Sequence, residues 1–267
     1  MEQDLAITLA PVLDSPRPLF REHFMAALVI KVGSCSAQGK RSNNEDTFFA
    51  DPSEQVYLVA DGMGGQEHGE LASGMAKEII PKVIRHSLAD QLDGTAAVRR
   101  ALTEAHQAIL EVGKENASCR KMGTTAVLAI QREDQVWVAG VGDSPAYLVR
   151  GNEVEQLTID HTVADALARN GTITPAQAKN SPWRNTLYRF LGCHDMTDEA
   201  EVRPFTPQAG DRLLLASDGL SGYVNADDLR QGAVEFTDPQ TWADYLVRLA
   251  LERGSSDNVT CVVVAFG

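Results

Sequence analysis

Short runs of β-branched and aromatic residues, separated by clusters of Gly, Asp and Asn, fill much of the chain from about residue 25 onward. Such runs are typical of β-strands. Ten are present, at residues 27–36, 46–51, 55–61, 124–131, 135–143, 146–151, 153–158, 200–205, 211–218 and 258–266. The preceding residues, 1–24, contain three prolines and little periodicity, so we interpret them as an N-terminal extension that packs loosely or adds one strand.

Helical periodicity occurs in three further regions. The first has an apolar residue at every fourth position: Leu71, Met75, Ile79 and Val83. The second has one apolar stripe, formed by Val98, Leu102, Ala105, Ile109 and Val112. The third lies at about 239–252, just before the last strand. Pro81 is expected to bend or interrupt the first helix.

The order of these elements limits the fold class. Strands and helices do not alternate as βαβ units, which favours antiparallel sheets with helices gathered against them, an α+β fold. The strands around residues 56–60 and 212–216 are apolar on both faces, so neither face is expected to meet water. Two sheets packed on each other and covered outside by helices satisfy this condition. No linker or repeat divides the chain, so residues 25–267 are predicted to form a single domain.

Residues 158–191, called the flap below, lack a long apolar run. A short helix is expected from about Val163 to the Asn170–Gly171 pair, because glycine supplies a left-handed cap. Thr174 and the proline after it are typical of an N-cap and first turn. The flap is therefore predicted to be a helical insertion at the surface and a candidate lid.

The composition excludes some classes of function. A net charge of −13, from 37 acidic and 24 basic residues, argues against nucleic-acid binding, which needs clustered Lys and Arg. The N-terminus lacks a signal-peptide pattern, and its longest apolar stretch is too short to cross a bilayer. The four cysteines form no C-x-x-C pair, which disfavours a zinc site and a disulfide framework. We therefore expect a cytoplasmic protein without a membrane partner.

Residues 59–70, VADGMGGQEHGE, place an aspartate at the end of an apolar strand, followed by four glycines within eight residues. A phosphate loop, a dinucleotide turn, a metal site and a plain tight turn all fit this pattern. The nearest approach to a Walker loop, residues 33–40, has the wrong spacing between its glycines. Residues 140–145, GVGDSP, lack the third glycine of a dinucleotide turn. Both of these candidates are rejected.

Three apolar strands end in an aspartate, and a fourth follows one: Asp61, Asp143, Asp218 and Asp257. Each alone is more often part of a turn than a ligand. If the four converge, their like charges must be neutralised, and a hard divalent cation with oxygen ligands does this. Mg²⁺ or Mn²⁺ fits better than zinc because no His or Cys accompanies them. Gly62, which has no side chain, would let its carbonyl approach a cation bound by Asp61.

Eight motifs occur in the order found in the metal-dependent, type 2C serine/threonine protein phosphatases of bacteria. They are RSNNEDTFFAD (41–51), VADGMGGQEHGELAS (59–73), GTTAVLAI (123–130), VGDSPAYLVRG (141–151), TIDHTVADAL (158–167), RNTLYRFLG (184–192), LLLASDGLSGYV (213–224) and SSDNVTCVVV (255–264). The chain resembles this family from about residue 32 to residue 266. The resemblance implies a four-layer α-β-β-α sandwich of two mainly antiparallel sheets, with residues 158–191 as its flap.

The resemblance also implies a site for two Mn²⁺ or Mg²⁺ ions. Its expected ligands are Glu45, Asp61, the carbonyl of Gly62, Asp218 and Asp257. Asp61 would bridge both ions, Glu45 and Gly62 would complete one ion, and the other two aspartates would complete the second. Asp46 resembles the carboxylate that holds the attacking water, and Arg41 resembles the phosphate clamp. Asp143 with Asp218 resembles a third, weaker metal site.

The implied reaction is hydrolysis of phosphoserine and phosphothreonine on proteins by a water between the two ions, with no phosphoenzyme. The implied partners are phosphorylated proteins, including a cognate kinase or its targets, and the implied state is a monomer. Two alternatives stay open: a catalytically inactive adaptor on the same fold, which would be expected to lose a ligand, and a phosphatase of anti-sigma-pathway proteins, which usually lacks a flap.

The sequence departs from the family pattern at a few positions. Pro145 stands where an arginine is usual, Gln66 stands where a histidine is usual, and the flap lacks one residue after Thr162. His161 is a candidate proton donor, although a flap histidine is more often structural, and His68 is a weaker candidate. None of the departures removes an expected ligand of the two-metal site.

Overall fold

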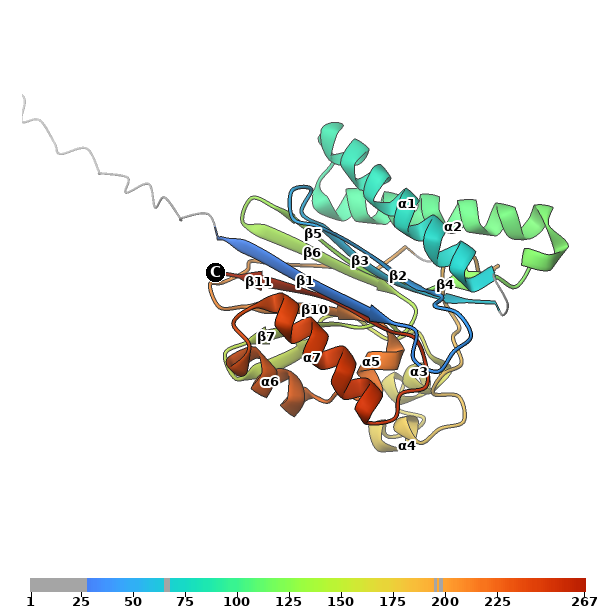
Figure 1. Ribbon diagram of the computed structural model, residues 1–267. Helices are drawn as coiled ribbons and strands as arrows, with labels where there is room; N and C mark the ends of the chain where they lie inside the picture. The colour runs from blue at the N-terminus through green and yellow to red at the C-terminus, as the bar shows by residue number, and fades with distance from the viewer. Residues whose placement is uncertain (1–27, 65–67, 195, 197–198) are drawn as a thin grey trace, which may run out of the picture.

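The computed structural model describes residues 28–64, 68–194, 196 and 199–267 (Figure 1). The predicted N-terminal extension, residues 1–24, lies outside them, as does Gln66. Within the described residues, two β-sheets pack face to face with helices on both outer sides (Figure 1). The α+β sandwich expected from the sequence is confirmed.

All the strand pairs in both sheets are antiparallel. One sheet has the strand order β1 (Ile30–Ala37), β11 (Val259–Phe266), β10 (Arg212–Ala216), β7 (Ala146–Arg150) and β8 (Glu153–Gln156). The other has the order β2 (Asp46–Asp51), β3 (Val56–Met63), β5 (Ala126–Arg132), β6 (Gln135–Val141) and β9 (Val202–Phe205), with the short β4 (Gly123–Thr124) paired to β3. The ten predicted strands are all present, and β4 is a separate short strand at the start of the segment expected at 124–131.

Helices form the two outer layers (Figure 1). The six-stranded sheet is covered by α1 (His68–Ala89) and α2 (Gly94–Glu115), which is followed by the 3₁₀ helix η1 (Ala117–Cys119). The five-stranded sheet is covered by α5 (Asp218–Ser221), α6 (Ala226–Glu235) and α7 (Pro239–Glu252). The flap contains α3 (Val163–Arg169) and α4 (Pro175–Lys179). No described helix is long and apolar enough to span a bilayer.

The central strands are buried on both faces, as their composition predicts. Residues 56–60 of β3 and 213–216 of β10 are at most 2% exposed. One face of each strand packs against the other sheet and the other face packs against helices, so each contributes to two of the three core clusters. All four cysteines are free.

Helix α1 differs from its prediction in two ways. It runs without interruption through Pro81, because Ala76, Ile80 and Ile84 on both sides of the proline are fully buried and hold the helix against the sheet. The buried face also lies one residue further along the chain than expected. Leu71, the first residue of the predicted stripe, is 43% exposed. The stripe therefore begins at the margin of the contact between α1 and the sheet.

The flap helices begin where the sequence places them. The side chain of Thr162 caps α3, and Thr174 forms a capping box with Gln177 at the start of α4. Asn170, beside Gly171, ends α3. The short helices α5 and α6 were not predicted, because strand signals before them and the charged residues within α6 obscure their periodicity.

Candidate metal-binding and catalytic site

Strand pairing brings the predicted site residues to one end of the sandwich. Asp46, at the start of β2, lies directly opposite Asp61 near the end of β3. Asp218 follows β10 as the first residue of α5, and Asp257 precedes β11, which pairs with β10. A hydrogen bond of 2.8 Å from the Ser217 hydroxyl to Asp46 Oδ2 joins this end of one sheet to the other.

The electrostatics show that these carboxylates share one environment. Burial, followed by the charges of four other aspartates, raises the pKa of Asp61 well above its usual value. Those four neighbours are Asp46, Asp218, Asp143 and Asp257. Burial likewise raises the pKa of Asp46 to about 7 and that of Asp143 to about 7, with Asp218 adding to both shifts. The structure therefore brings the four predicted aspartates together, with Asp46 among them.

Asp46 is the most enclosed member of the cluster, with 8% of its surface exposed. Its Oδ2 accepts the hydrogen bond from Ser217, whereas its Oδ1 is buried without a hydrogen-bond partner. A buried carboxylate oxygen without a partner carries a desolvation cost, and such atoms usually mark a site for water, an ion or a ligand. The unpartnered oxygen is consistent with the role predicted for Asp46 next to an attacking water.

Arg41 lies at the open side of the cluster. Its Nη2 donates to Asp257 Oδ2 at 2.6 Å, and its side chain is 55% exposed. The hydrogen bond with Asp257 raises the pKa of Arg41, and the charges of Asp61 and Glu45 add to the shift. Arg41, the predicted phosphate clamp, therefore interacts electrostatically with three predicted ligands. Its exposed side chain has room to change position.

Asn258 holds the loop that carries Arg41 and Glu45. Its Nδ2 donates to the carbonyls of Gln38 and Asn43 at 2.8 and 2.9 Å, and its Oδ1 accepts from the Glu45 amide at 2.8 Å. The side chain is 5% exposed, so these bonds are shielded from water. Residue 258 therefore fixes the position of a predicted ligand from the opposite sheet.

Close packing explains two of the glycines after Asp61, Gly62 and Gly69. A Cβ on Gly62 would lie 2.1 Å from the carbonyl oxygen of Gly69 and 2.7 Å from that of Glu45. A Cβ on Gly69 would lie 2.8 Å from the Glu45 carboxylate. The Ser73 hydroxyl donates to the Glu45 carbonyl at 2.6 Å. The absence of side chains thus allows the first turn of α1 to press against Glu45, a steric reason that the sequence interpretation of Gly62 did not include.

The backbone of Asp61 is fixed by two threonines. Its amide donates to Thr125 Oγ1 at 3.0 Å, and its carbonyl accepts from Thr124 Oγ1 at 2.9 Å. Thr125 Oγ1 is also 2.7 Å from the hydroxyl of Ser144, the residue after Asp143. A short network therefore connects the two loops that carry Asp61 and Asp143.

The cluster fits a hard divalent cation in its donor chemistry. Its donors are all oxygens, and Asp46 Oδ1 lacks a partner. No three His, Cys, Asp or Glu side chains among the described residues form a ready-made metal cage. Instead, burial and the charge of Asp257 raise the pKa of Asp218, and Arg41 pairs with Asp257. Binding of a cation would therefore require Arg41 to leave Asp257, which its exposure permits.

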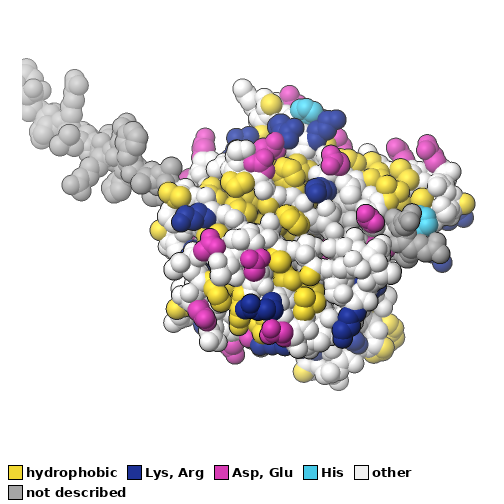
Figure 2. Space-filling model, in the orientation of Figure 1, with side chains coloured by type: hydrophobic (Ala, Val, Ile, Leu, Met, Phe, Trp, Pro, Cys, Tyr) yellow, Lys and Arg dark blue, Asp and Glu magenta, His cyan; other side chains and the backbone are white. Residues whose placement is uncertain are grey.

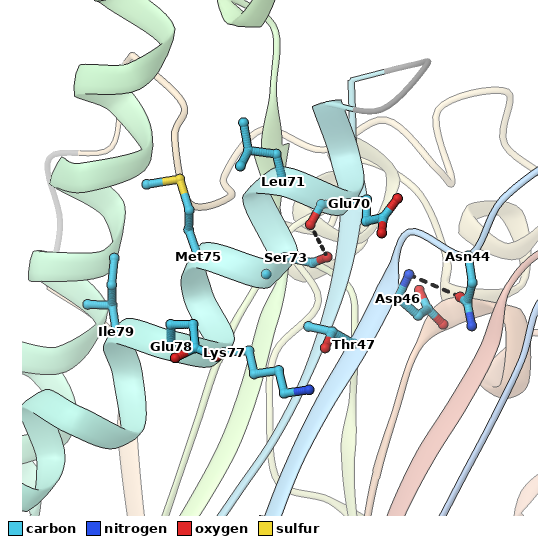
Figure 3. Close-up of a pocket in the computed structure, with 11 residues that line it drawn as sticks. Asn44, Asp46, Thr47, Glu70, Leu71, Ser73, Met75, Lys77, Glu78 and Ile79 are labelled. Atoms are coloured by element: carbon cyan, nitrogen blue, oxygen red, sulfur yellow. Dashed lines mark hydrogen bonds between the residues drawn. The ribbon is translucent and has the colours of Figure 1, made fainter.

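A surface hollow of about 820 Å³ adjoins the cluster (Figure 3). It is lined by Asn44, Asp46 and Thr47 and by a face of α1 between Glu70 and Ile79. Figure 3 shows Asn44 and Asp46 beside each other at the start of β2, across from α1. Molecules from the solvent can therefore reach the region beside Asp46 through this hollow.

His161 is placed as a structural residue. Its backbone amide donates to the Gly142 carbonyl at 2.9 Å, and its Nδ1 accepts from the Gly142 amide at 3.0 Å. Burial, followed by the charges of Arg189 and Arg169, lowers the pKa of His161 to about 4. The ring is therefore neutral at physiological pH, which disfavours the proton-donor role. His68 is the first residue of α1.

Three positioning residues were missed in the sequence: Gly69, Ser217 and Asn258. Ser217 and Asn258 each sit next to a predicted aspartate, and that adjacency was the only signal available. Pro145, where the family usually has arginine, is buried, and its carbonyl accepts from the Ala216 amide at 3.1 Å. The departure therefore leaves this backbone contact between the segments of β7 and β10 in place.

Comparisons with known proteins agree with this geometry. Residues 35–261 match the family model described as protein phosphatase 2C. The chain is 33% identical over 232 residues to the serine/threonine phosphatase stp of Listeria welshimeri, covering 84% of this chain and 90% of the relative. It is also 33% identical over 239 residues to the serine/threonine protein phosphatase PstP of Mycobacterium tuberculosis, covering 88% of this chain and 45% of that protein.

Solved structures are similar to the same extent. The crystal structure of the M. tuberculosis phosphatase PstP/Ppp superposes with a TM-score of 0.79 at 32% identity, covering 89% of this chain and 99% of that one. A structure of the catalytic domain of PstP in complex with two manganese ions gives a TM-score of 0.77 at 31% identity, covering 90% and 99%. The chain therefore belongs to the protein phosphatase 2C family, whose enzymes depend on divalent metal ions.

Proposed function

We propose that this chain is a metal-dependent protein phosphatase that removes phosphate from phosphoserine and phosphothreonine on proteins. The observation that carries the proposal is the convergence of Asp46, Asp61, Asp218 and Asp257 at one end of the sandwich, with Arg41 beside them. The relatives support it, because they are named serine/threonine phosphatases and resemble this chain over most of its length.

The proposed metal ligands are Glu45, Asp61, the Gly62 carbonyl, Asp218 and Asp257. Two Mn²⁺ or Mg²⁺ ions held there would supply an activated water at neutral pH and neutralise charge on the phosphoryl group. Arg41 turns from Asp257 to the phosphate oxygens, to which its guanidinium can donate two parallel hydrogen bonds. Asp46 Oδ1 would accept a hydrogen bond from the attacking water, while Ser217 holds Oδ2 in place.

The remaining assignments follow from the family. Asp143 with Asp218 is proposed to hold a third, weaker ion, supported by the charge of Asp218 acting on the pKa of Asp143. The substrates are phosphorylated proteins, including a cognate kinase or its targets. We also propose that residues 25–267 work as a single, monomeric domain in the cytoplasm.

The decisive experiment measures phosphate release by the full chain from a phosphothreonine peptide. Release is expected with Mn²⁺, none after treatment with a chelator, and recovery when Mn²⁺ is added back, because all the proposed ligands are oxygen donors. Full release after thorough removal of metal would exclude the two-metal mechanism. Peptide binding without any release would favour the inactive adaptor.

A further inference from the structure

The flap presents large apolar side chains to solvent. Seven of these are exposed among the described residues, and three belong to the flap: Ile159, Trp183 and Tyr188, at 38%, 52% and 45%. One exposed apolar residue is ordinary, but several on one small insertion indicate a binding surface. Aromatic residues are also enriched where proteins contact partners.

The flap also differs from the rest of the chain in charge. It carries Arg169, Lys179, Arg184 and Arg189 against only Asp160 and Asp165, whereas the whole chain has a net charge of −13. Both acids already have partners: Asp165 lies 3.5 Å from Arg169, and Asp160 accepts from Gln156 at 2.7 Å. Lys179 and Arg184 are exposed and form no ion pair with a described residue. Positive charge is therefore left available beside the aromatic side chains.

Tight turns hold these residues close together. The Ser181 amide donates to the Ala178 carbonyl at 3.0 Å, and the Arg184 amide donates to the Ser181 carbonyl at 3.2 Å. Lys179, Trp183 and Arg184 therefore belong to one compact segment. The hydroxyl of Tyr188 accepts from Arg169 Nη2 at 2.8 Å, which orients its ring.

Both ends of the flap are tied to the carboxylate cluster. At one end, His161 exchanges hydrogen bonds with Gly142, the residue before Asp143. At the other end, Leu191 and Thr124 exchange backbone bonds of 2.9 and 3.1 Å, and Thr124 also bonds to the Asp61 carbonyl. The two ends of the flap are thereby held beside the segments that carry Asp61 and Asp143.

We propose that Lys179, Trp183, Arg184 and Tyr188 bind an acidic segment of the phosphoprotein substrate, next to its phosphorylated residue. The two free cations attract aspartate and glutamate side chains, and the exposed rings cover apolar parts of the same segment. This inference rests on the proposed function and adds the class of sequence that the enzyme prefers. Nucleic acid is the poorer fit, because the acidic remainder of the chain repels a long polyanion.

The test compares three phosphothreonine peptides, with acidic, neutral or basic residues flanking the phosphothreonine, on the full chain with Mn²⁺. The wild type is expected to favour the acidic over the basic peptide by about tenfold or more in kcat/KM, mainly through KM. The Lys179→Glu/Arg184→Glu variant should lose or reverse this preference, and Trp183→Ala should weaken it. Hydrolysis of p-nitrophenyl phosphate, which is too small to reach the flap, should stay unchanged.

Arg132→Glu provides the matched control. Arg132 is exposed at the end of β5, opposite to the end that leads into the carboxylate cluster, and forms no ion pair with a described residue. The Arg132→Glu variant should keep the preference for the acidic peptide, although it also replaces an exposed positive charge by a negative one. Added salt should reduce the preference of the wild type, because exposed charges are screened.

Several results would overturn the inference. These are equal kcat/KM for the acidic and basic peptides in the wild type, a preference that survives Lys179→Glu/Arg184→Glu, and an equal loss in Arg132→Glu. A single-stranded oligonucleotide is tested as an inhibitor. If changing Arg184 weakens this inhibition more than it weakens peptide hydrolysis, the surface belongs to nucleic acid instead. The two proposals are separable, because absence of p-nitrophenyl phosphate hydrolysis would contradict the phosphatase itself, not only its preference.

Discussion

Asp46 and Asp211 are both buried carboxylates, but their surroundings differ. Asp211, 2% exposed, accepts from Arg150 at 2.9 and 2.6 Å and from the Gln208 amide at 2.8 Å. Asp46 accepts a hydrogen bond from the Ser217 hydroxyl, leaves Oδ1 without a partner and lies among other aspartates. The first carboxylate has a cation and hydrogen bonds supplied by the fold. The second has its charge opposed by neighbours of the same sign.

The difference separates a structural acid from a functional one. A buried ion pair with its hydrogen bonds complete needs nothing further, and its removal mainly harms the fold. A cluster of acids whose pKa values are raised by burial and by one another is costly until a proton or a cation enters it. A buried aspartate therefore supports the fold at one end of the sandwich, as Asp211 does, and marks a candidate site at the other end, as Asp46 does. Figure 2 shows that acidic and basic side chains are otherwise interspersed over one face of the molecule.

The largest effect is expected for Asp61→Asn. Turnover should fall by about a thousandfold or more, because Asp61, the ligand proposed to be shared by both ions, loses its charge. The metal-free protein should keep its melting temperature or gain, since one charge leaves a cluster of like charges. Phosphate release and thermal unfolding, each with and without Mn²⁺, measure the two effects. Near-normal turnover would show that residues 59–65 form only a turn.

Asp211→Asn should give the opposite pattern. Loss of the carboxylate leaves Arg150 without its charged partner, but Arg150 is 37% exposed and water can solvate it, so stability should fall by about 1.5 kcal/mol. Turnover per folded molecule should stay close to the wild type at a temperature well below the transition. Denaturant unfolding measures the loss of stability. Metal titration counts the molecules with an intact site, so that turnover can be given per folded molecule. A fall in turnover with unchanged stability would end the proposed distinction between the two acids.

The sequence carried much of this information, for physical reasons that can be named. Runs of β-branched and aromatic residues between turn residues located the strands, and the apolar composition of β3 and β10 on both faces indicated a two-sheet sandwich. The aspartates could be grouped because each follows or precedes an apolar strand. These are local signals, whereas the pairing of Asp46 with Asp61 in the sheet is shown only by the structure.

What the sequence did not reveal depends on contacts distant along the chain. Asn258 binds the carbonyls of Gln38 and Asn43 more than two hundred residues away, and no local pattern specifies that. The need for Gly69 arises from Glu45 on another element. The apolar stripe of helix α1 was placed one residue out of register because Ala72 and Ala76, which begin the buried face, carry a weaker apolar signal than Leu71 and Met75.

A smaller effect should appear in the pH dependence of the metal-free protein. The pKa of Asp46 is raised from 3.8 to about 7 in the fold, so the folded state holds its proton more tightly than the unfolded chain does. Stability should therefore fall as pH rises from about 4 to about 7 and stay low above that. Asp46→Asn should reduce this slope without removing it, because Asp143 and Asp61 also have raised pKa values, whereas Asp211→Asn should keep it. Melting temperatures in chelator across pH 4–8 provide the measurement, and an unchanged slope in Asp46→Asn would contradict the raised pKa.

The smallest effect is expected at the margin of the cluster, for Asp143→Ala. Asp143 is influenced by Asp218 and by Asp160 of the flap, which places it between the two-metal site and the flap. If it serves a third, weaker ion, turnover should fall by about tenfold, the size of effect typical of groups outside the primary ligands. Calorimetry should still detect the tighter pair of ions.

Asp165→Ala is the control for Asp143→Ala, because Asp165 is a flap acid that pairs with Arg169 at 3.5 Å and has no place in the cluster. It should change neither turnover at saturating Mn²⁺ nor the calorimetric stoichiometry. Loss of all metal binding in Asp143→Ala would instead place Asp143 in the two-metal site. If Asp143 binds a weak third ion, its removal must lower turnover when that ion is limiting. Unchanged turnover of Asp143→Ala at every Mn²⁺ concentration would therefore place Asp143 with Asp211, as an acid whose burial serves the fold.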